Sequence, residues 1–214
     1  MTETQMREEI CLLARSMFDR GLTFGSSGNI SVRCDDGKLL VTPTESCLGR
    51  LDPVRISLLD TNGVLLSGDK PTKEMPLHTA FYESRSKAGA IVHLHSSHSV
   101  ALSTLPVEDT ANFLPPLTAY SIMRLGKVAL LPYFRPGDRA VAQAITDLGG
   151  RHSAVMLAKH GPVVAGKDLE EAVFAIEELE ETSKLALMLR GMPAIGLDQA
   201  QVQDIVKQFD VDWS

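Results

Sequence analysis

The first third of the chain combines one long amphipathic segment with several short apolar runs. Apolar residues from Met6 to Phe18 recur every three or four positions, the spacing of one helix face, and Gly21 follows where a helix commonly ends. This pattern predicts a helix over residues 4–20. Two pairs of short apolar runs come next, and each pair encloses an Asp-Gly or Asn-Gly turn, which is typical of β-hairpins. The four runs lie at 30–33, 39–42, 56–59 and 64–66.

The middle of the chain interleaves predicted helices with predicted strands. Pro76 suits the first turn of a helix that buries Leu77 and Phe81 on one side. Asp138 can cap a further amphipathic helix, which ends at Gly149. Apolar, β-like runs lie at 90–95, 128–131, 154–157 and 163–165.

Two more helices are predicted towards the end of the chain. Asp168 and Glu171 resemble a capping box at the start of the longest helix, which runs to Arg190. The four glutamates within 177–181 of this helix are most simply a solvated face. A final helix is predicted over residues 198–209, followed by an aromatic tail.

These elements predict a mainly antiparallel or mixed sheet with helices on both faces. Helices and strands do not alternate regularly enough for a doubly wound parallel sheet, and the stretch 96–127 shows no regular pattern. Gly21, Gly25 and Gly28 miss the GxGxxG spacing, so no dinucleotide site is implied. A chain of 214 residues can bury one good core, so we expect a single domain over 1–214.

The composition narrows the class of protein. A net charge of −6 and a pI near 5.5 give no basic surface, so we expect no nucleic-acid partner. Three cysteines without a CxxC pair argue against a secreted, disulfide-bonded protein. The first residues lack the basic and apolar segments of a signal peptide, and no apolar run approaches the ~20 residues of a membrane span. We therefore expect a cytoplasmic protein with no membrane partner.

The histidine pair in the predicted strand 90–95 is the first candidate for chemistry. Alternation along a strand places Ile91, His93 and His95 on one face. Two neutral imidazoles side by side can hold a divalent ion when a third ligand arrives, and His160, on a turn between two apolar runs, is that candidate. The alternative is a polar or satisfied buried pair that binds no metal. The sequence context favours a metal-dependent enzyme.

A second group of residues could form an anion cradle. It combines backbone amides, an amide side chain, hydroxyls and one ammonium group, which together can hold a phosphate. The same residues could instead form turns in which Ser and Thr bond their own backbone. Glu74 could be a fourth metal ligand, a general base or a surface acid at a helix N-terminus, and the residues alone favour the surface acid. The cradle candidates are Gly28, Asn29, Thr44, Ser46, Thr72 and Lys73.

In combination, these motifs resemble those of the class II aldolase/adducin family. The similarity runs over about residues 5–190, nearly the whole chain, and the combined order is specific although no single motif is. The motifs are Gly28-Asn29-x-Ser31, Thr42-Pro43-Thr44, Lys73-Glu74 ahead of a helix with His78, His93-x-His95, and His160-Gly161.

The resemblance implies a fold, a cofactor and a set of site residues. The implied fold is a three-layer α/β/α sandwich around a mainly antiparallel or mixed sheet. The implied cofactor is one zinc ion held by His93, His95 and His160, with Glu74 as the acid/base and possible fourth ligand in the absence of substrate. The implied phosphate contacts are Gly28, Asn29, Thr44, Thr72 and Lys73.

Within the family, the local sequence resembles the 3-oxo-tetronate 4-phosphate decarboxylases. Where the aldolases have Thr-Gly and Ser-Ser, this chain has Thr44-Glu45 and Thr72-Lys73. Lys73 could bind a substrate carboxylate or phosphate, which a plain aldolase does not require. The implied reaction converts a phosphorylated sugar acid to CO2 and dihydroxyacetone phosphate.

Other interpretations share parts of this pattern. A sugar-phosphate aldolase or pentulose-phosphate 4-epimerase would use the same metal site. In an aldolase, Tyr120 could be the acid that protonates the aldehyde oxygen; the alternative is that Tyr120 is only a packed aromatic residue. A non-catalytic, adducin-like module would not need the three histidines. Three imidazoles suit several divalent ions besides zinc. The resemblance also implies a homo-oligomer, commonly a tetramer in which a neighbouring chain completes the site.

Overall fold

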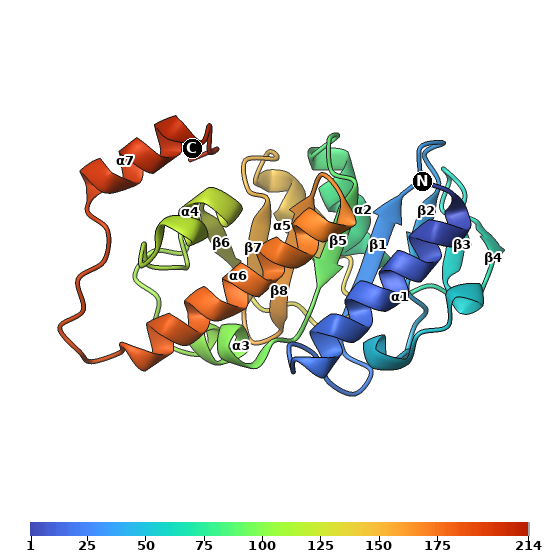
Figure 1. Ribbon diagram of the computed structural model, residues 1–214, viewed down its shortest axis with the longest axis horizontal. Coiled ribbons are helices and arrows are strands. Elements are labelled where there is room, and N and C mark those ends of the chain that lie inside the picture. Colours follow the sequence, from blue (N-terminus) through green and yellow to red (C-terminus); the bar gives the residue numbers. More distant parts are fainter. Residues whose placement is uncertain (214) are drawn as a thin grey trace.

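A single eight-stranded sheet runs through the computed structural model, which describes residues 1–213 (Figure 1). The strands are β1 (Asn29–Arg33), β2 (Leu39–Val41), β3 (Ser57–Leu59), β4 (Leu65–Ser67), β5 (Ala90–His93), β6 (Val128–Leu131), β7 (Ala154–Leu157) and β8 (Gly161–Gly166). Across the sheet they follow the order β4-β3-β2-β1-β5-β8-β7-β6. All neighbouring strands are antiparallel except β6 and β7, which are parallel. The predicted mainly antiparallel, mixed sheet is therefore confirmed.

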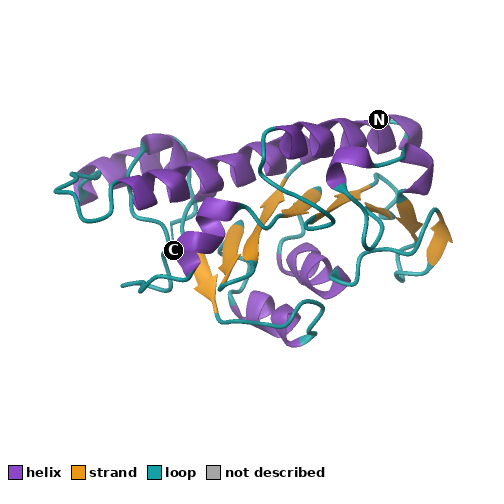
Figure 2. Ribbon diagram, turned by 90° about the horizontal axis from the view of Figure 1, so that it is seen from below, coloured by secondary structure: helices purple, strands orange, loops and turns teal. Residues whose placement is uncertain are grey.

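Helices cover both faces of this sheet and make a three-layer sandwich (Figure 2). The helices are α1 (Glu3–Asp19), α2 (Met75–Ser84), α3 (Ser97–Ser103), α4 (Ala119–Leu125), α5 (Ala140–Asp147), α6 (Leu169–Met188) and α7 (Gln199–Gln208), with short 3-10 turns at Leu48–Arg50 and Pro53–Arg55. On one face the core contains Ile10 of α1 and Ile176 of α6. On the other face it contains Phe81 of α2 and Ile145 of α5. The three-layer α/β/α fold is thus confirmed.

The central strand β5 joins the two cores. Ala90 and Val92 belong to the core under α1 and α6, whereas Ile91 belongs to the core under α2 and α5, as strand alternation requires. The strand ends at His93, two residues earlier than predicted, because the chain turns into α3 with Ser96 at its N-cap. This central position makes the end of β5 a rigid place for a functional side chain.

Two helices lie in the stretch where the sequence showed no pattern. α3 and α4 have seven residues each, too few for a clear helical period, and α4 is started by the Thr118 hydroxyl, which accepts from the N–H of Ser121. The helix expected after Asp138 begins at Ala140 with Arg139 at the N-cap, although Asp138 still accepts the Ala140 N–H at 3.0 Å. The prediction that Asp138 caps this helix is therefore only partly confirmed: Asp138 accepts a hydrogen bond from the first turn, but it is not the N-cap residue.

The acidic run of α6 is not simply a solvated face, contrary to the sequence-based expectation. The Glu180 carboxylate accepts the backbone N–H groups of His98 and Ser99, both at 2.9 Å. Glu177 forms an ion pair with Arg20 of the segment after α1. A carboxylate at a helix N-terminus satisfies orphan N–H groups and complements the helix dipole, so α6 anchors α3.

Two further expectations can be compared with the structure. Within residues 1–213, no helix has both the length and the apolar character needed to cross a bilayer. Cys11, Cys34 and Cys47 are free thiols.

Candidate metal centre and adjoining pocket

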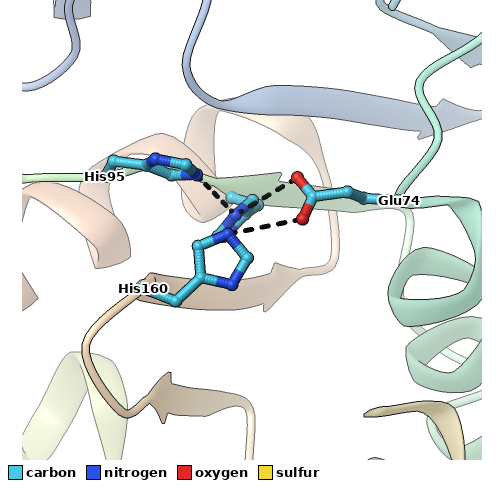
Figure 3. A group of neighbouring side chains, drawn as sticks. Glu74, His95 and His160 are labelled. Atoms are coloured by element: carbon cyan, nitrogen blue, oxygen red, sulfur yellow. Dashed lines mark hydrogen bonds and ion pairs between the residues drawn. The ribbon is translucent and has the colours of Figure 1, made fainter. Parts of the chain in front are cut away.

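Four side chains from three separate segments converge at one end of the central strands. His93 ends β5, His95 lies two residues further on, His160 lies in the turn between β7 and β8, and Glu74 is the N-cap residue of α2. One nitrogen or oxygen from each lies within 4.8 Å of the others. Figure 3 shows the side chains of Glu74, His95 and His160 pointing toward one another. The sequence-predicted metal ligands and Glu74 are therefore brought together.

Glycine at position 161 allows this convergence. A Cβ atom at Gly161 would collide with the carbonyl oxygen of Leu94, the residue between the two histidines of β5 and its extension. The N–H of Leu94 bonds to the carbonyl of Pro162 at 3.2 Å. The turn that carries His160 is thus held directly against the chain that carries His93 and His95.

Hydrogen bonding fixes the tautomer of His93. Its Nδ1 lies 2.9 Å from the carbonyl oxygen of Pro162, and because a carbonyl can only accept, Nδ1 carries the proton. The Nε2 lone pair then points into the cluster, 3.1 Å from Nε2 of His95 and 3.5 Å from Oε2 of Glu74. A backbone carbonyl that orients an imidazole in this way is typical of a metal-ligating histidine.

The electrostatics of the cluster also fit a metal ion. Burial lowers the pKa of His93 to about 3, and the neighbouring His160 adds to this effect. Burial lowers the pKa of His95 to about 3 as well, with His93 and His160 adding to it. Both ring nitrogens of His160 are buried and have no hydrogen-bond partner among the described residues, while its Nε2 lies 3.4 Å from Oε1 of Glu74. Neutral imidazoles facing a carboxylate are the donor set of a divalent cation, so the residues present fit a metal.

Glu74 is held inside this cluster rather than at the surface. It is 7% exposed, and its Oε2 accepts the Nδ2 amide of Asn29 at 2.8 Å. The interpretation of Glu74 as a surface acid, which the residues alone favoured, is therefore wrong. The sequence carries no sign of this burial, because the partner Asn29 comes from β1, 45 positions away.

A pocket of about 370 Å³ adjoins the cluster. All five residues that the resemblance implied for phosphate binding line it, together with Glu74 and His95. Thr72 is buried, while Lys73 is exposed at the rim. Glu45 also lines this pocket, with its backbone in the left-handed region at φ 58°. The implied phosphate residues are Gly28, Asn29, Thr44, Thr72 and Lys73.

Some predicted residues lie elsewhere, and others were missed. Ser46 donates to the carbonyl of Pro43 at 2.7 Å, so it bonds its own turn, as the alternative interpretation held. Tyr120 is 60% exposed on α4 and lines a separate pocket with Phe174. Ser26, Ser27 and Pro136 line the pocket beside the metal cluster without having been predicted. Pro136 comes from the segment between β6 and α5, and no local motif marks it.

The fold and the site together indicate a metal-dependent α/β enzyme with a pocket next to its candidate metal cluster. The chain belongs to the family described as the class II aldolase and adducin N-terminal domain, whose model matches residues 8–187. Its relatives include decarboxylases and aldolases, and class II aldolases are metal-dependent, consistent with a metal-dependent lyase.

Proteins similar to this chain include decarboxylases and aldolases. A protein of Escherichia coli K12 named 3-oxo-tetronate 4-phosphate decarboxylase is 47% identical over 95% of this chain and 96% of its own length. The crystal structure of YgbL from Escherichia coli matches with a TM-score of 0.92 and 46% identity over 95% of this chain and 98% of that one. A protein of Methanocaldococcus jannaschii named L-fuculose phosphate aldolase is 35% identical over 85% of this chain and 96% of its own. The predicted resemblance to the decarboxylases is therefore confirmed, with aldolases as more distant relatives.

Proposed function

We propose that this protein decarboxylates a 3-oxo-tetronate 4-phosphate to dihydroxyacetone phosphate and CO2, in the breakdown of four-carbon sugar acids. The observation that carries the proposal is the cluster of His93, His95, His160 and Glu74 beside a pocket with anion-binding groups. The 47% identity to a protein named for this reaction supports the choice of substrate.

We assign the metal to the three histidines and propose zinc. Three imidazole nitrogens with one further position left for a carboxylate oxygen or for substrate match a catalytic zinc site. When bound there, the ion would polarise the ketone of the substrate and stabilise the negative charge that develops as CO2 departs.

The residues of the chain position the substrate and move a proton. The Asn29 amide and the Thr44 and Thr72 hydroxyls would bind the phosphate, and the Lys73 ammonium at the rim would meet the phosphate or the carboxylate. The electron pair of the broken carbon–carbon bond remains on the three-carbon fragment. Glu74, which borders both the pocket and the cluster, would deliver a proton to that carbon.

Further properties belong to the same proposal. We propose a cytoplasmic homotetramer whose chain is one domain over residues 1–214. All the described strands belong to one sheet, which supports the single domain. Tyr120, exposed on α4 and away from the pocket of its own chain, would reach a site only across such an assembly. Its acid role therefore stays a prediction, tied to the alternative of a sugar-phosphate aldolase or 4-epimerase.

The test is direct. The metal-replete protein is incubated with a 3-oxo-tetronate 4-phosphate while CO2 and dihydroxyacetone phosphate are followed together. Both should appear in equal amounts and should be lost with EDTA or in the Glu74→Gln variant. Cleavage of L-fuculose 1-phosphate to the same triose, without any CO2 from the sugar acid, would replace the decarboxylase by an aldolase.

A further inference from the structure

A continuous buried chain of hydrogen bonds leads away from Glu74 into the core beneath the sheet. Asn29 connects Glu74 to His78 of α2, with 2.6 Å between Oδ1 of Asn29 and Nε2 of His78. The other ring nitrogen, Nδ1 of His78, lies 2.8 Å from the Ser31 hydroxyl, which lies 3.0 Å from the Tyr82 hydroxyl. Each of these five side chains is at most 7% exposed.

The directions of these bonds follow from which groups can donate. Nδ2 of Asn29 donates to the Glu74 carboxylate, so Oδ1 of Asn29 faces His78 and must accept. Nε2 of His78 therefore carries the proton, and Nδ1 accepts from Ser31, whose oxygen accepts from Tyr82. Burial lowers the pKa of His78 to about 3, with His93 adding to the effect, so the ring holds one proton at neutral pH.

Asn29 lies where the orientation of its amide decides what the site can bind. It borders the pocket that adjoins the metal cluster and also touches Glu74. With Oδ1 turned to His78, the N–H groups are left for the two anions, Glu74 and the substrate phosphate. A flipped amide would set Oδ1 against those same negative charges.

We propose that His78 is a positioning residue that locks the amide of Asn29, so that its N–H donors serve both Glu74 and the phosphate of the substrate. The buried Nε2–H of His78 is the lock, and Ser31 and Tyr82 fix the tautomer that carries this proton. The link to substrate phosphate rests on the proposed function, whereas the lock itself does not.

A first experiment tests the lock without substrate. In 15N-labelled, zinc-loaded protein, the NMR signals of the His78 ring should show a protonated Nε2 and an unprotonated Nδ1. The Ser31→Ala variant, which removes the donor to Nδ1 but keeps the ring, should weaken this preference. A protonated Nδ1 in the unchanged protein would overturn the proposal whether or not the enzyme is a decarboxylase.

A second experiment tests what the lock does. His78→Leu, which leaves no donor for Oδ1 of Asn29, should raise KM for the phosphorylated substrate by about tenfold, the effect of losing one hydrogen bond to a charged group, and should raise KM for the unphosphorylated 3-oxo acid much less. Ser84→Ala on the same helix is the matched control and should leave both KM values unchanged, because the Ser84 hydroxyl bonds, within residues 1–213, only to carbonyls of its own helix. Equal KM increases for both substrates would mean a merely structural role and would overturn the proposal.

A variant that combines the changes at His78 and Asn29 tests whether His78 acts through Asn29 or independently of it. Asn29→Asp places an oxygen where the flipped amide would place one, so it should reproduce the loss of phosphate binding. If His78 acts through Asn29, the double variant should be no worse than Asn29→Asp alone. Losses that multiply would refute the lock. If His78→Leu does not fold, Ser31→Ala takes its place in the cycle with the same two outcomes.

Discussion

Gly28 shows how tightly a single residue is constrained by the metal centre. Its φ is +85°, and an added Cβ would lie 2.9 Å from the carbonyl oxygen of His93. The position therefore requires glycine for two reasons: the backbone conformation and the close approach to β5. The close approach links the loop before β1 to His93, a proposed metal ligand.

Replacing Gly28 by Ala should weaken metal binding as well as stability. Gly63 supplies the matched control, because its φ is +79° but an added Cβ there meets no atom within 4 Å. Gly63→Ala should cost only the backbone strain, about 1–2 kcal/mol of unfolding free energy, and should leave metal affinity unchanged. Gly28→Ala should cost more and should raise the Kd for zinc, measured by calorimetry. Equal effects of the two variants would show that the contact with His93 does not matter.

Buried neutral histidines predict how the metal-free protein responds to acid. The native pKa values of His78 and His93 are about 3, well below the ordinary 6.5, so in the window between these values the unfolded chain binds protons that the native chain does not. Stability is therefore complete above pH 6.5 and falls as the pH drops through the window, approaching about 1.4 kcal/mol per pH unit for each histidine.

Chemical unfolding of the EDTA-treated protein at a series of pH values measures this slope. His93→Gln should make the slope shallower by one proton. Gln203→Ala should leave it unchanged, because this exposed side chain carries no titratable group. The same slope in all three proteins would contradict the assignment to buried rings.

At the scale of elements, the short helix α3 connects two proposed metal ligands, His95 and His160. It follows directly after His95, and its first N–H groups are held by Glu180 of α6. Near its other end, the Ser103 hydroxyl accepts the N–H of Lys159 at 3.0 Å, next to His160. Because α3 is held at both ends, the distance between His95 and His160 depends on where α6 holds α3.

Loss of the charge of Glu180 should loosen the attachment of α3 to α6. Glu180 is 13% exposed and accepts from α3, whereas Glu181 is 57% exposed and pairs only with Lys184 among the described residues. Glu180→Gln should lower the unfolding free energy by about 1.5–3 kcal/mol, and Glu181→Gln by less than about 0.5 kcal/mol. Thermal unfolding compares the two variants, and zinc affinity should fall only in Glu180→Gln. Similar losses of unfolding free energy in both variants would mean that the glutamates of α6 act only through their overall negative charge.

Elements with a long periodic pattern were predicted more accurately than short ones. The long helices α1 and α6 and the central strand were predicted within a few residues because many apolar positions define their buried faces. α3 was not predicted, because its start depends on a carboxylate 81 to 82 positions away. The short motifs likewise suggested the pocket residues but not the burial of Glu74, which depends on contacts with Asn29 of β1, His93 of β5 and His160 of the turn before β8.

At the scale of the molecule, the metal site joins distant parts of the chain. Its candidate ligands come from the N-cap of α2, the end of β5 and the turn before β8, so a bound ion would tie residues 74, 93, 95 and 160 together. An ion that binds only the folded chain stabilises it by mass action, about 2.7 kcal/mol at a concentration 100 times the Kd. For a chain of this length, each kcal/mol raises Tm by about 2–4 °C.

Zinc at 100 times its Kd should therefore raise the Tm of the EDTA-treated protein by about 5–10 °C, measured by calorimetry at pH 7.5. The rise should vanish in His95→Gln, which removes one ligand, and should persist in His98→Gln, which removes a neighbouring exposed imidazole. It should also shrink as the pH falls, since protons compete with the metal for the imidazoles. Binding to the native state must stabilise the native state. If zinc does not change the Tm of the unchanged protein, or raises the Tm equally in both variants, the cluster is not the metal site.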